Sequence, residues 1–183
     1  PILKEGRGID RDLAVLTDVT AARFLRNGYI EPLDRASMPN TVNVIPSLAD
    51  AAWDPGRTFT LPFLNGLIGI GYNKALAGRE LKSFSELLTD EFRGKVAISS
   101  EMEDTMGFFL MANGKQTEAF TDADFDQAIA DLQAAFDRGQ FRRVAGNDYG
   151  ADLTNGDLVA SIGYSGDVLQ IQLENPDVVF YMP

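Results

Sequence analysis

Leu158-Val159-Ala160-Ser161-Ile162-Gly163-Tyr164-Ser165-Gly166-Asp167 is the stretch that decides the fold of this chain, because an apolar run ends here in a polar turn. The apolar residues at 158–163 predict a buried strand, and a helix is expected over 168–173. The same order occurs upstream, where an apolar run at 95–99 precedes an acidic turn and a helix expected over 104–112. Strands that alternate with helices predict an α/β fold, with helices on both faces of a mostly parallel sheet.

The rest of the sequence adds further elements to this alternation. Thr17 is expected to cap a helix, and Ser83 with Glu86 and Ser100 with Glu103 have the spacing of capping boxes. Several prolines between residues 29 and 57 predict a long surface connection. Further strands are expected at 12–16, 58–62, 66–73, 141–145 and 178–182, and further helices at 18–26, 48–52, 83–88, 149–155 and, as a long amphipathic helix, around 125–136.

Composition excludes several classes of function. The 183 residues are 45% hydrophobic and 23% charged, as in ordinary globular proteins, and no apolar run approaches the ~20 residues of a membrane helix. Sixteen Lys and Arg against 27 Asp and Glu give a net charge of −11. This charge disfavours binding to nucleic acid and attracts cations, and solubility by itself is an alternative explanation of it. Without Cys or His, the chain has no disulfide, thiolate nucleophile, Ser-His-Asp triad or His-ligated zinc. We expect no cofactor and no metal.

Two strand-to-helix turns carry the candidate binding residues. Glu101 and Asp104 follow the strand at 95–99, whereas Tyr164 and Asp167 follow the strand at 158–163. An aromatic face and carboxylates suit a small organic cation. Helix dipoles and caps also explain acidic residues in a first turn, and we assign Glu103 to such a structural role. General acid–base chemistry and calcium binding stay open as alternatives, although the usual alternating ligands of a calcium loop are missing.

An ordered set of motifs resembles the substrate-binding component of bacterial ABC importers for polyamines, the spermidine- and putrescine-binding proteins. The resemblance extends over nearly the whole chain, and its motifs are individually loose but specific as an ordered set. The segments that carry it are Asp12-Leu13-Ala14-Val15-Leu16-Thr17, Leu61-Pro62-Phe63-Leu64-Asn65-Gly66, Ile68-Gly69-Ile70-Gly71-Tyr72-Asn73, Ser83-Phe84-Ser85-Glu86-Leu87-Leu88, and Asn155-Gly156-Asp157 through Ile162-Gly163-Tyr164-Ser165-Gly166-Asp167.

The resemblance implies a two-lobed α/β fold of the type II periplasmic-binding-protein class, with mostly one complete lobe in this chain. Residues 1–65 would form part of lobe one and the crossover, and residues 66–183 would form lobe two. The chain, which starts at Pro1 without an initiator Met, is expected to be a central fragment of a longer protein. Such a fragment is expected to bind ligand weakly or not at all.

The resemblance also assigns roles to individual positions. Tyr164 is similar to a pocket tryptophan and Asp167 to an ammonium-binding aspartate, while Asp104 with Glu101 beside it looks like the acidic anchor of the other turn. Thr17 lies where the family often has a pocket serine, and Asp18 is adjacent. Two further departures from the family are Asn65, where an aromatic residue is common, and Val19, where some members have a tyrosine.

The predicted function is non-catalytic capture of putrescine or spermidine in the periplasm or another extracytoplasmic space. Delivery to the membrane permease of an ABC importer would follow. A signal or a lipid anchor of the full-length protein would lie outside this chain. Three alternatives are kept. The first is a solute-binding protein for an amino-acid derivative, a cationic osmolyte or ferric iron. The others are a hydrolase that uses paired carboxylates and a purely structural interaction domain.

Overall fold

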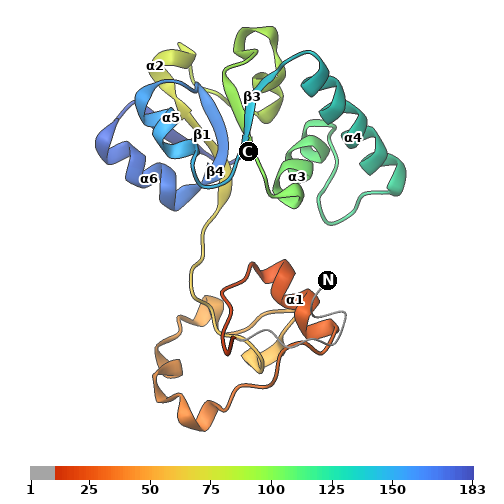
Figure 1. Cartoon of the computed structure of the whole chain (residues 1–183), viewed down its shortest axis with the longest axis vertical. Coiled ribbons are helices and arrows are strands. Elements are labelled where there is room, and N and C mark those ends of the chain that lie inside the picture. Colours follow the sequence, from red (N-terminus) through yellow and green to blue (C-terminus); the bar gives the residue numbers. More distant parts are fainter. Residues whose placement is uncertain (1–10) are drawn as a thin grey trace. The chain divides into compact units, whose positions relative to one another are not determined.

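The computed structural model describes residues 11–183, and the chain divides into two compact units, Pro1–Asn65 and Gly66–Pro183. We call them unit 1 and unit 2 and describe each by itself. Figure 1 colours the described part of unit 1 from red to yellow and unit 2 from yellow to blue. No helix within residues 11–183 has the length and apolar character needed to span a bilayer.

Unit 2 is built on one five-stranded sheet within residues 66–183, with the strand order β3-β2-β4-β1-β5. The strand β2 pairs in parallel with β3 and β4, whereas β1 pairs antiparallel with β4 and β5. The strands are β1 (Ile68–Asn73), β2 (Val96–Ser99), β3 (Phe141–Ala145), β4 (Ala160–Tyr164) and β5 (Val178–Tyr181). Four of these strands therefore run in one direction, and only β1 of this sheet runs against them.

The helices of unit 2 explain this strand direction. Each step from β2 to β5 passes through one or two helices that return the chain to the same end of the sheet, which makes successive strands parallel. The helices are α2 (Lys74–Ala77), α3 (Met102–Ala112), α4 (Asp122–Asp137), α5 (Tyr149–Asn155) and α6 (Ser165–Glu174), and the 3-10 turns are η6 (Phe84–Leu88) and η7 (Asp90–Phe92). The prediction of a mostly parallel sheet is confirmed except for β1, the first strand of unit 2.

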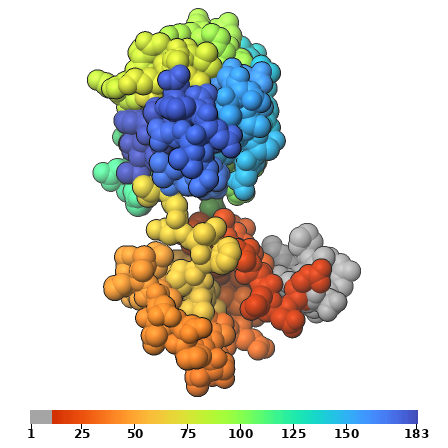
Figure 2. All heavy atoms as spheres, turned by 90° about the vertical axis from the view of Figure 1, so that its left-hand side faces the viewer, coloured from red at the N-terminus to blue at the C-terminus, as the bar shows by residue number. Residues whose placement is uncertain are grey.

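Both faces of the sheet carry a buried core, as predicted. Val96 and Ile98 of β2 belong to one hydrophobic cluster, and Ala97 between them belongs to the other, because successive strand residues point to opposite faces. The first cluster includes Phe108 and Phe109 of α3 and also residues of α4. The second includes residues of α5 and α6, which Figure 2 shows in blue as the layer facing the viewer. Full burial of one large apolar side chain, such as Val96 or Phe108, contributes about 1.5–3 kcal/mol to the stability of the fold.

The described part of unit 1 has one α-helix and four 3-10 turns. They are α1 (Asp18–Arg26), η2 (Arg35–Ser37), η3 (Pro39–Asn43), η4 (Pro46–Leu48) and η5 (Pro55–Arg57). Three of the turns begin with proline, whose fixed φ and missing N–H suit a first helical position. The buried carboxylate of Asp54 accepts hydrogen bonds from the backbone N–H of Phe59 and from the backbone and hydroxyl of Thr60. These bonds hold the end of the surface connection.

Three expected elements of unit 1 are wrong. Residues 12–16 and 58–62 form no strand, and in place of a helix at 48–52 the chain has the shorter turn η4. Leu13 and Val15 are 85% and 75% exposed. A strand needs a neighbour for its backbone hydrogen bonds, and residues 11–65 contain none, so β-branched and apolar composition alone does not produce one.

The predicted caps have mixed outcomes. Thr17 caps α1 as expected, with its hydroxyl oxygen accepting from the N–H of Thr20 at 3.4 Å. Ser83 precedes η6 without a side-chain capping bond. Glu101 and not Ser100 occupies the N-cap position of α3, without a side-chain capping bond, so the box expected of Ser100 with Glu103 is wrong. The complete capping box is at α4 and was not predicted: Thr121 accepts from the N–H of Asp124, whose carboxylate accepts from the N–H of Thr121.

Candidate functional site

Three strands of unit 2 end at the same edge of the sheet, which we call the carboxyl edge. Because β2, β3 and β4 are parallel, their last residues and the first turns of α3, α5 and α6 lie together there. The N–H of Ser100 donates to the carbonyl of Ala145, which ties the ends of β2 and β3. The N–H of Leu67 donates to Ser165 Oγ at 3.1 Å, and the N–H of Ser165 donates to the Leu67 carbonyl. The carboxyl edge of an open α/β sheet is a common place for ligands.

Tyr164 and Asp104 join two of these turns. Tyr164 is the last residue of β4, and Asp104 lies in the first turn of α3, 60 residues earlier. The Tyr164 hydroxyl donates to Asp104 Oδ2 at 3.3 Å, and both side chains are half-buried. The structure therefore brings together the two turns that the sequence singled out.

The electrostatics of Tyr164 show that the acidic side chains act on the same spot. Burial raises the pKa of the Tyr164 hydroxyl, and the negative charge of Asp104 together with the bond to it raises the pKa further. Smaller contributions come from the charges of Glu101 and Asp167. All of these effects disfavour a phenolate, so the hydroxyl stays a hydrogen-bond donor in a negative environment.

Asp167 is held by Tyr149, a residue that the sequence analysis missed. The Tyr149 hydroxyl donates to Asp167 Oδ2 at 2.9 Å and accepts from the backbone N–H of Tyr164 at 2.8 Å. Tyr149 is only 1% exposed, and Gly163 beside it leaves room for its ring. The sequence did contain a signal, because Tyr149 begins a helix shortly after a strand, as Tyr164 does. The short helix that follows Tyr149 has no cluster of acidic residues like the one at Glu101–Asp104.

Arg143 neutralises a further carboxylate at the carboxyl edge. Its guanidinium contacts Asp148 Oδ2 at 2.6 Å and Asp152 Oδ2 at 2.9 Å, and it also donates to the Asp148 carbonyl. The hydrogen bond from Arg143 is the main reason that the pKa of Asp148 is lowered. The charge of Asp148 is thus compensated within the protein, and the ion pairs fix the turn from β3 into α5.

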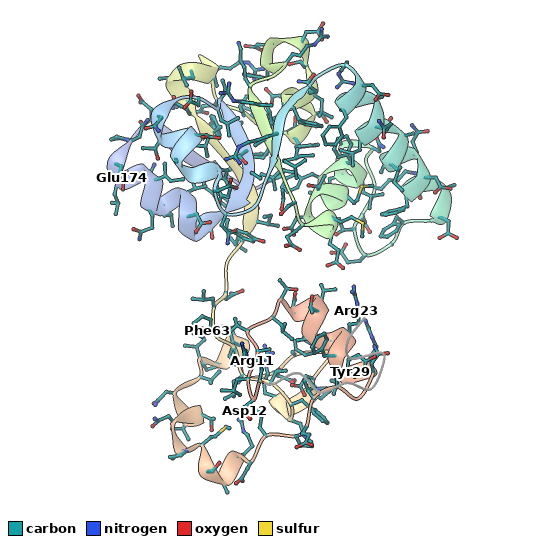
Figure 3. All side chains as sticks on the ribbon, viewed as in Figure 1. Arg11, Asp12, Arg23, Tyr29, Phe63 and Glu174 are labelled. Carbon is teal, nitrogen blue, oxygen red and sulfur yellow. The ribbon has the colours of Figure 1, made fainter. Side chains whose placement is uncertain are left out.

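The remaining predicted residues are Glu101 in unit 2 and Thr17 and Asp18 in unit 1. Glu101 is exposed at the start of α3 and makes no side-chain capping bond. Thr17 and Asp18 belong to unit 1, where the Thr17 hydroxyl donates to Thr20 Oγ1 and Asp18 Oδ1 accepts from the N–H of Val19. In Figure 3, Arg11 and Asp12 precede the helix that Thr17 caps, and Glu174 marks the end of α6 in unit 2. Unit 2 therefore gathers Glu101, Asp104, Tyr164 and Asp167, whereas Thr17 and Asp18 belong to unit 1.

The carboxyl edge combines negative charge with an aromatic ring. Carboxylates supply charge-assisted hydrogen bonds, and the half-buried ring of Tyr164 supplies an apolar, electron-rich face. Within residues 11–183, no group of three or more acidic side chains is arranged to hold a metal ion. Carboxylates beside an aromatic ring are groups that suit an organic ammonium ion.

Known proteins similar to this chain are solute-binding proteins. A family model described as bacterial extracellular solute-binding protein matches residues 3–183. The putrescine-binding periplasmic protein PotF of Escherichia coli is 30% identical over 172 residues, which cover 87% of this chain and 46% of PotF. The chain thus spans less than half the length of this relative.

Two solved structures have a similar fold. The spermidine/putrescine ABC transporter substrate-binding protein PotD of Streptococcus pneumoniae matches with a TM-score of 0.75 and 17% identity, over 99% of this chain and 55% of that one. The TpPotD lipoprotein of Treponema pallidum matches with a TM-score of 0.77 and 18% identity, over 90% of this chain and 52% of that one. At these identities the likeness concerns the fold alone.

Proposed function

Because the chain belongs to the family of bacterial extracellular solute-binding proteins, we propose that it forms part of a protein that captures a linear polyamine without catalysis. Putrescine and spermidine are the ligands we expect, and delivery to the membrane permease of an ABC importer is the expected next step. The protein would act in the periplasm or another extracytoplasmic space. A lipid anchor belongs to this proposal only as a feature of the full-length protein.

The observation that carries the proposal is the position of two carboxylates at opposite ends of one tyrosine. Asp104 lies at the hydroxyl end of Tyr164. Asp167 lies toward the backbone end, since Tyr149 bonds both to Asp167 and to the N–H of Tyr164. One carboxylate is thus bonded to the hydroxyl of Tyr164, and the other is linked through Tyr149 to its backbone N–H. A diamine has this same order of groups, with a cation at each end and an apolar methylene chain in the middle.

The magnitudes favour such a ligand over a single ammonium group. Two unit charges 4 Å apart attract by about 4 kcal/mol at an effective dielectric constant of ~20, before desolvation is subtracted. Contact of a cation with an aromatic ring adds about 0.5–2 kcal/mol. A ligand with two ammonium groups can pair with both the half-buried Asp104 and the exposed Asp167. It therefore gains a second charge–charge attraction that a ligand with one ammonium group lacks.

Calorimetry on the full-length protein tests this function. We expect putrescine or spermidine to bind at micromolar or lower concentration, and Asp104→Ala and Asp167→Ala each to weaken binding at least tenfold, because each removes one anchor. Asp126→Ala is the matched control, since it removes the same charge from an exposed position on α4. Absence of binding by the unaltered protein, or equal affinity in all four proteins, would overturn the proposal.

The alternatives are separated by competition. The competitors are an amino-acid derivative, a cationic osmolyte and ferric iron. If one of them displaces bound putrescine more readily than spermidine does, that competitor and not a polyamine is the ligand. Turnover of a glycoside that Glu101→Gln abolishes would favour the hydrolase instead.

A further inference from the structure

We propose that Tyr149 is the positioning residue of this site, and that it acts by fixing the carboxylate of Asp167 for the ammonium group of the ligand. The inference rests on the proposed function, because it concerns the same site. Tyr149 itself is buried and would not touch the ligand.

The directions of the two hydrogen bonds leave Tyr149 no freedom. The backbone N–H of Tyr164 can only donate, so it must point to a lone pair of the Tyr149 oxygen. The carboxylate of Asp167 can only accept when it is ionised, so the hydroxyl proton of Tyr149 must point to its Oδ2. One hydroxyl therefore sets the position of both the strand end and the acidic side chain.

Burial keeps this hydroxyl in its donating form. The buried setting strongly raises the pKa of Tyr149, and the bond to Asp167 raises the pKa further. A neutral tyrosine is thus present throughout the physiological pH range, and the bond to Asp167 does not switch off.

The ring of Tyr149 is itself locked from two sides. A Cβ added to Gly163 would lie 2.6 Å from the Tyr149 ring, closer than such atoms approach, so the strand is shaped to admit the ring. On the chain side, Arg143 bonds to the carboxylate and the carbonyl of Asp148, the residue just before Tyr149. Packing and ion pairs thus restrain the position of the hydroxyl that holds Asp167.

The bond leaves the other oxygen of Asp167 for the ligand. Oδ2 is taken by Tyr149, whereas within residues 11–183 no hydrogen bond to Asp167 Oδ1 is present. Asp167 is exposed, and a side chain on the first turn of a helix would otherwise sample several rotamers. Fixing it in advance lowers the ordering cost of binding.

Tyr149→Phe in the full-length protein tests the proposal by calorimetry with putrescine. We expect about tenfold weaker binding, the scale of a hydrogen bond to a charged group. Tyr72→Phe is the matched control, since Tyr72 is also buried and its hydroxyl also accepts from a backbone N–H, that of Leu81. Both changes are expected to lower the unfolding temperature by similar amounts, and only Tyr149→Phe is expected to weaken binding.

A double-mutant cycle separates positioning from a merely structural effect. If Tyr149 acts through Asp167, Tyr149→Phe added to Asp167→Asn causes no further loss of affinity, because the charge that it positions is already gone. Equal binding by Tyr149→Phe and the unaltered protein, or a full additional loss in the double variant, would overturn the inference. Failure of the unaltered protein to bind any diamine would instead overturn the proposed function, which keeps the two failures distinct.

Discussion

Gly163 lies beneath the ring of Tyr149, and this contact makes one small residue a requirement of the site. A methyl group at position 163 would overlap the ring at 2.6 Å. The backbone there is an ordinary strand, so the need for glycine comes from close approach and not from an unusual φ. The contact explains why the residue before the last one of β4 has no side chain.

Gly163→Ala is therefore expected to destabilise the protein by about 1–3 kcal/mol, the usual cost of overpacking. Urea denaturation measures the change. Gly166→Ala is the control, because a Cβ at Gly166 meets no atom within 4 Å and alanine favours the helix. Similar stabilities of the two variants would contradict the contact.

Tyr164 carries two separable groups, a ring and a hydroxyl. Tyr164→Phe keeps the ring but removes the donor to Asp104 Oδ2, and we expect putrescine affinity to fall about three- to tenfold, the scale of one hydrogen bond. Tyr164→Ala removes the ring as well and is expected to weaken binding further. Calorimetry compares the two, and a phenylalanine variant as weak as the alanine variant would show that the ring contributes nothing.

At the scale of elements, α4 carries the complete capping box of this chain's described residues. Asp124 accepts from Thr121 and pairs with Lys115 at 2.8 Å. The bond from Lys115 is the largest of the effects that lower the pKa of Asp124 from 3.8 to about 2. The carboxylate is therefore favoured in the folded state.

The sign of the pH dependence follows from this lowered pKa. The contribution of Asp124 to stability is fully present above pH 3.8 and is lost as the pH falls through about 2. NMR titration of the Asp124 carboxyl carbon is expected to give a midpoint near 2, and Lys115→Gln is expected to move that midpoint upward. A midpoint that stays at the ordinary value of 3.8 would contradict the ion pair.

Elements also differ in how far their sequences specify them. The helix after Thr17 follows from a local capping residue, and the prediction is confirmed. The run at 12–16 has strand-like composition, yet Leu13 and Val15 lie exposed without a pairing strand in the described part of unit 1. Local signals act over a few residues, whereas a strand depends on a partner that can be far away in the sequence.

At the scale of the whole molecule, the predicted α/β fold and type II class agree with the solved structures that the chain resembles. The chain spans about half of each of those structures. The assignment of residues 1–65 and 66–183 to lobes one and two stays a prediction. Polyamine capture by the complete protein accordingly stays a proposal.

A comparison of chain lengths tests that proposal. The relatives are about twice as long, and we expect their additional residues to supply further contacts to the ligand. Excess putrescine is therefore expected to raise the unfolding temperature of the full-length protein by several degrees and that of residues 1–183 by less. Equal shifts would show that residues 1–183 bind the ligand without the additional residues of the full-length protein.

The sequence by itself determined the alternation of strands and helices, the cap at Thr17 and the acidic residues that follow two strands. These features depend on neighbours a few positions away, which periodicity and capping chemistry reveal. Only the tertiary structure decided that β1 runs against the other strands, that Tyr164 meets Asp104, and that Tyr149 holds Asp167. The two side-chain contacts join residues that are 18 and 60 positions apart in the sequence, and the direction of β1 depends on strand pairing. No local sequence pattern encodes which distant side chain will pack beside a given strand.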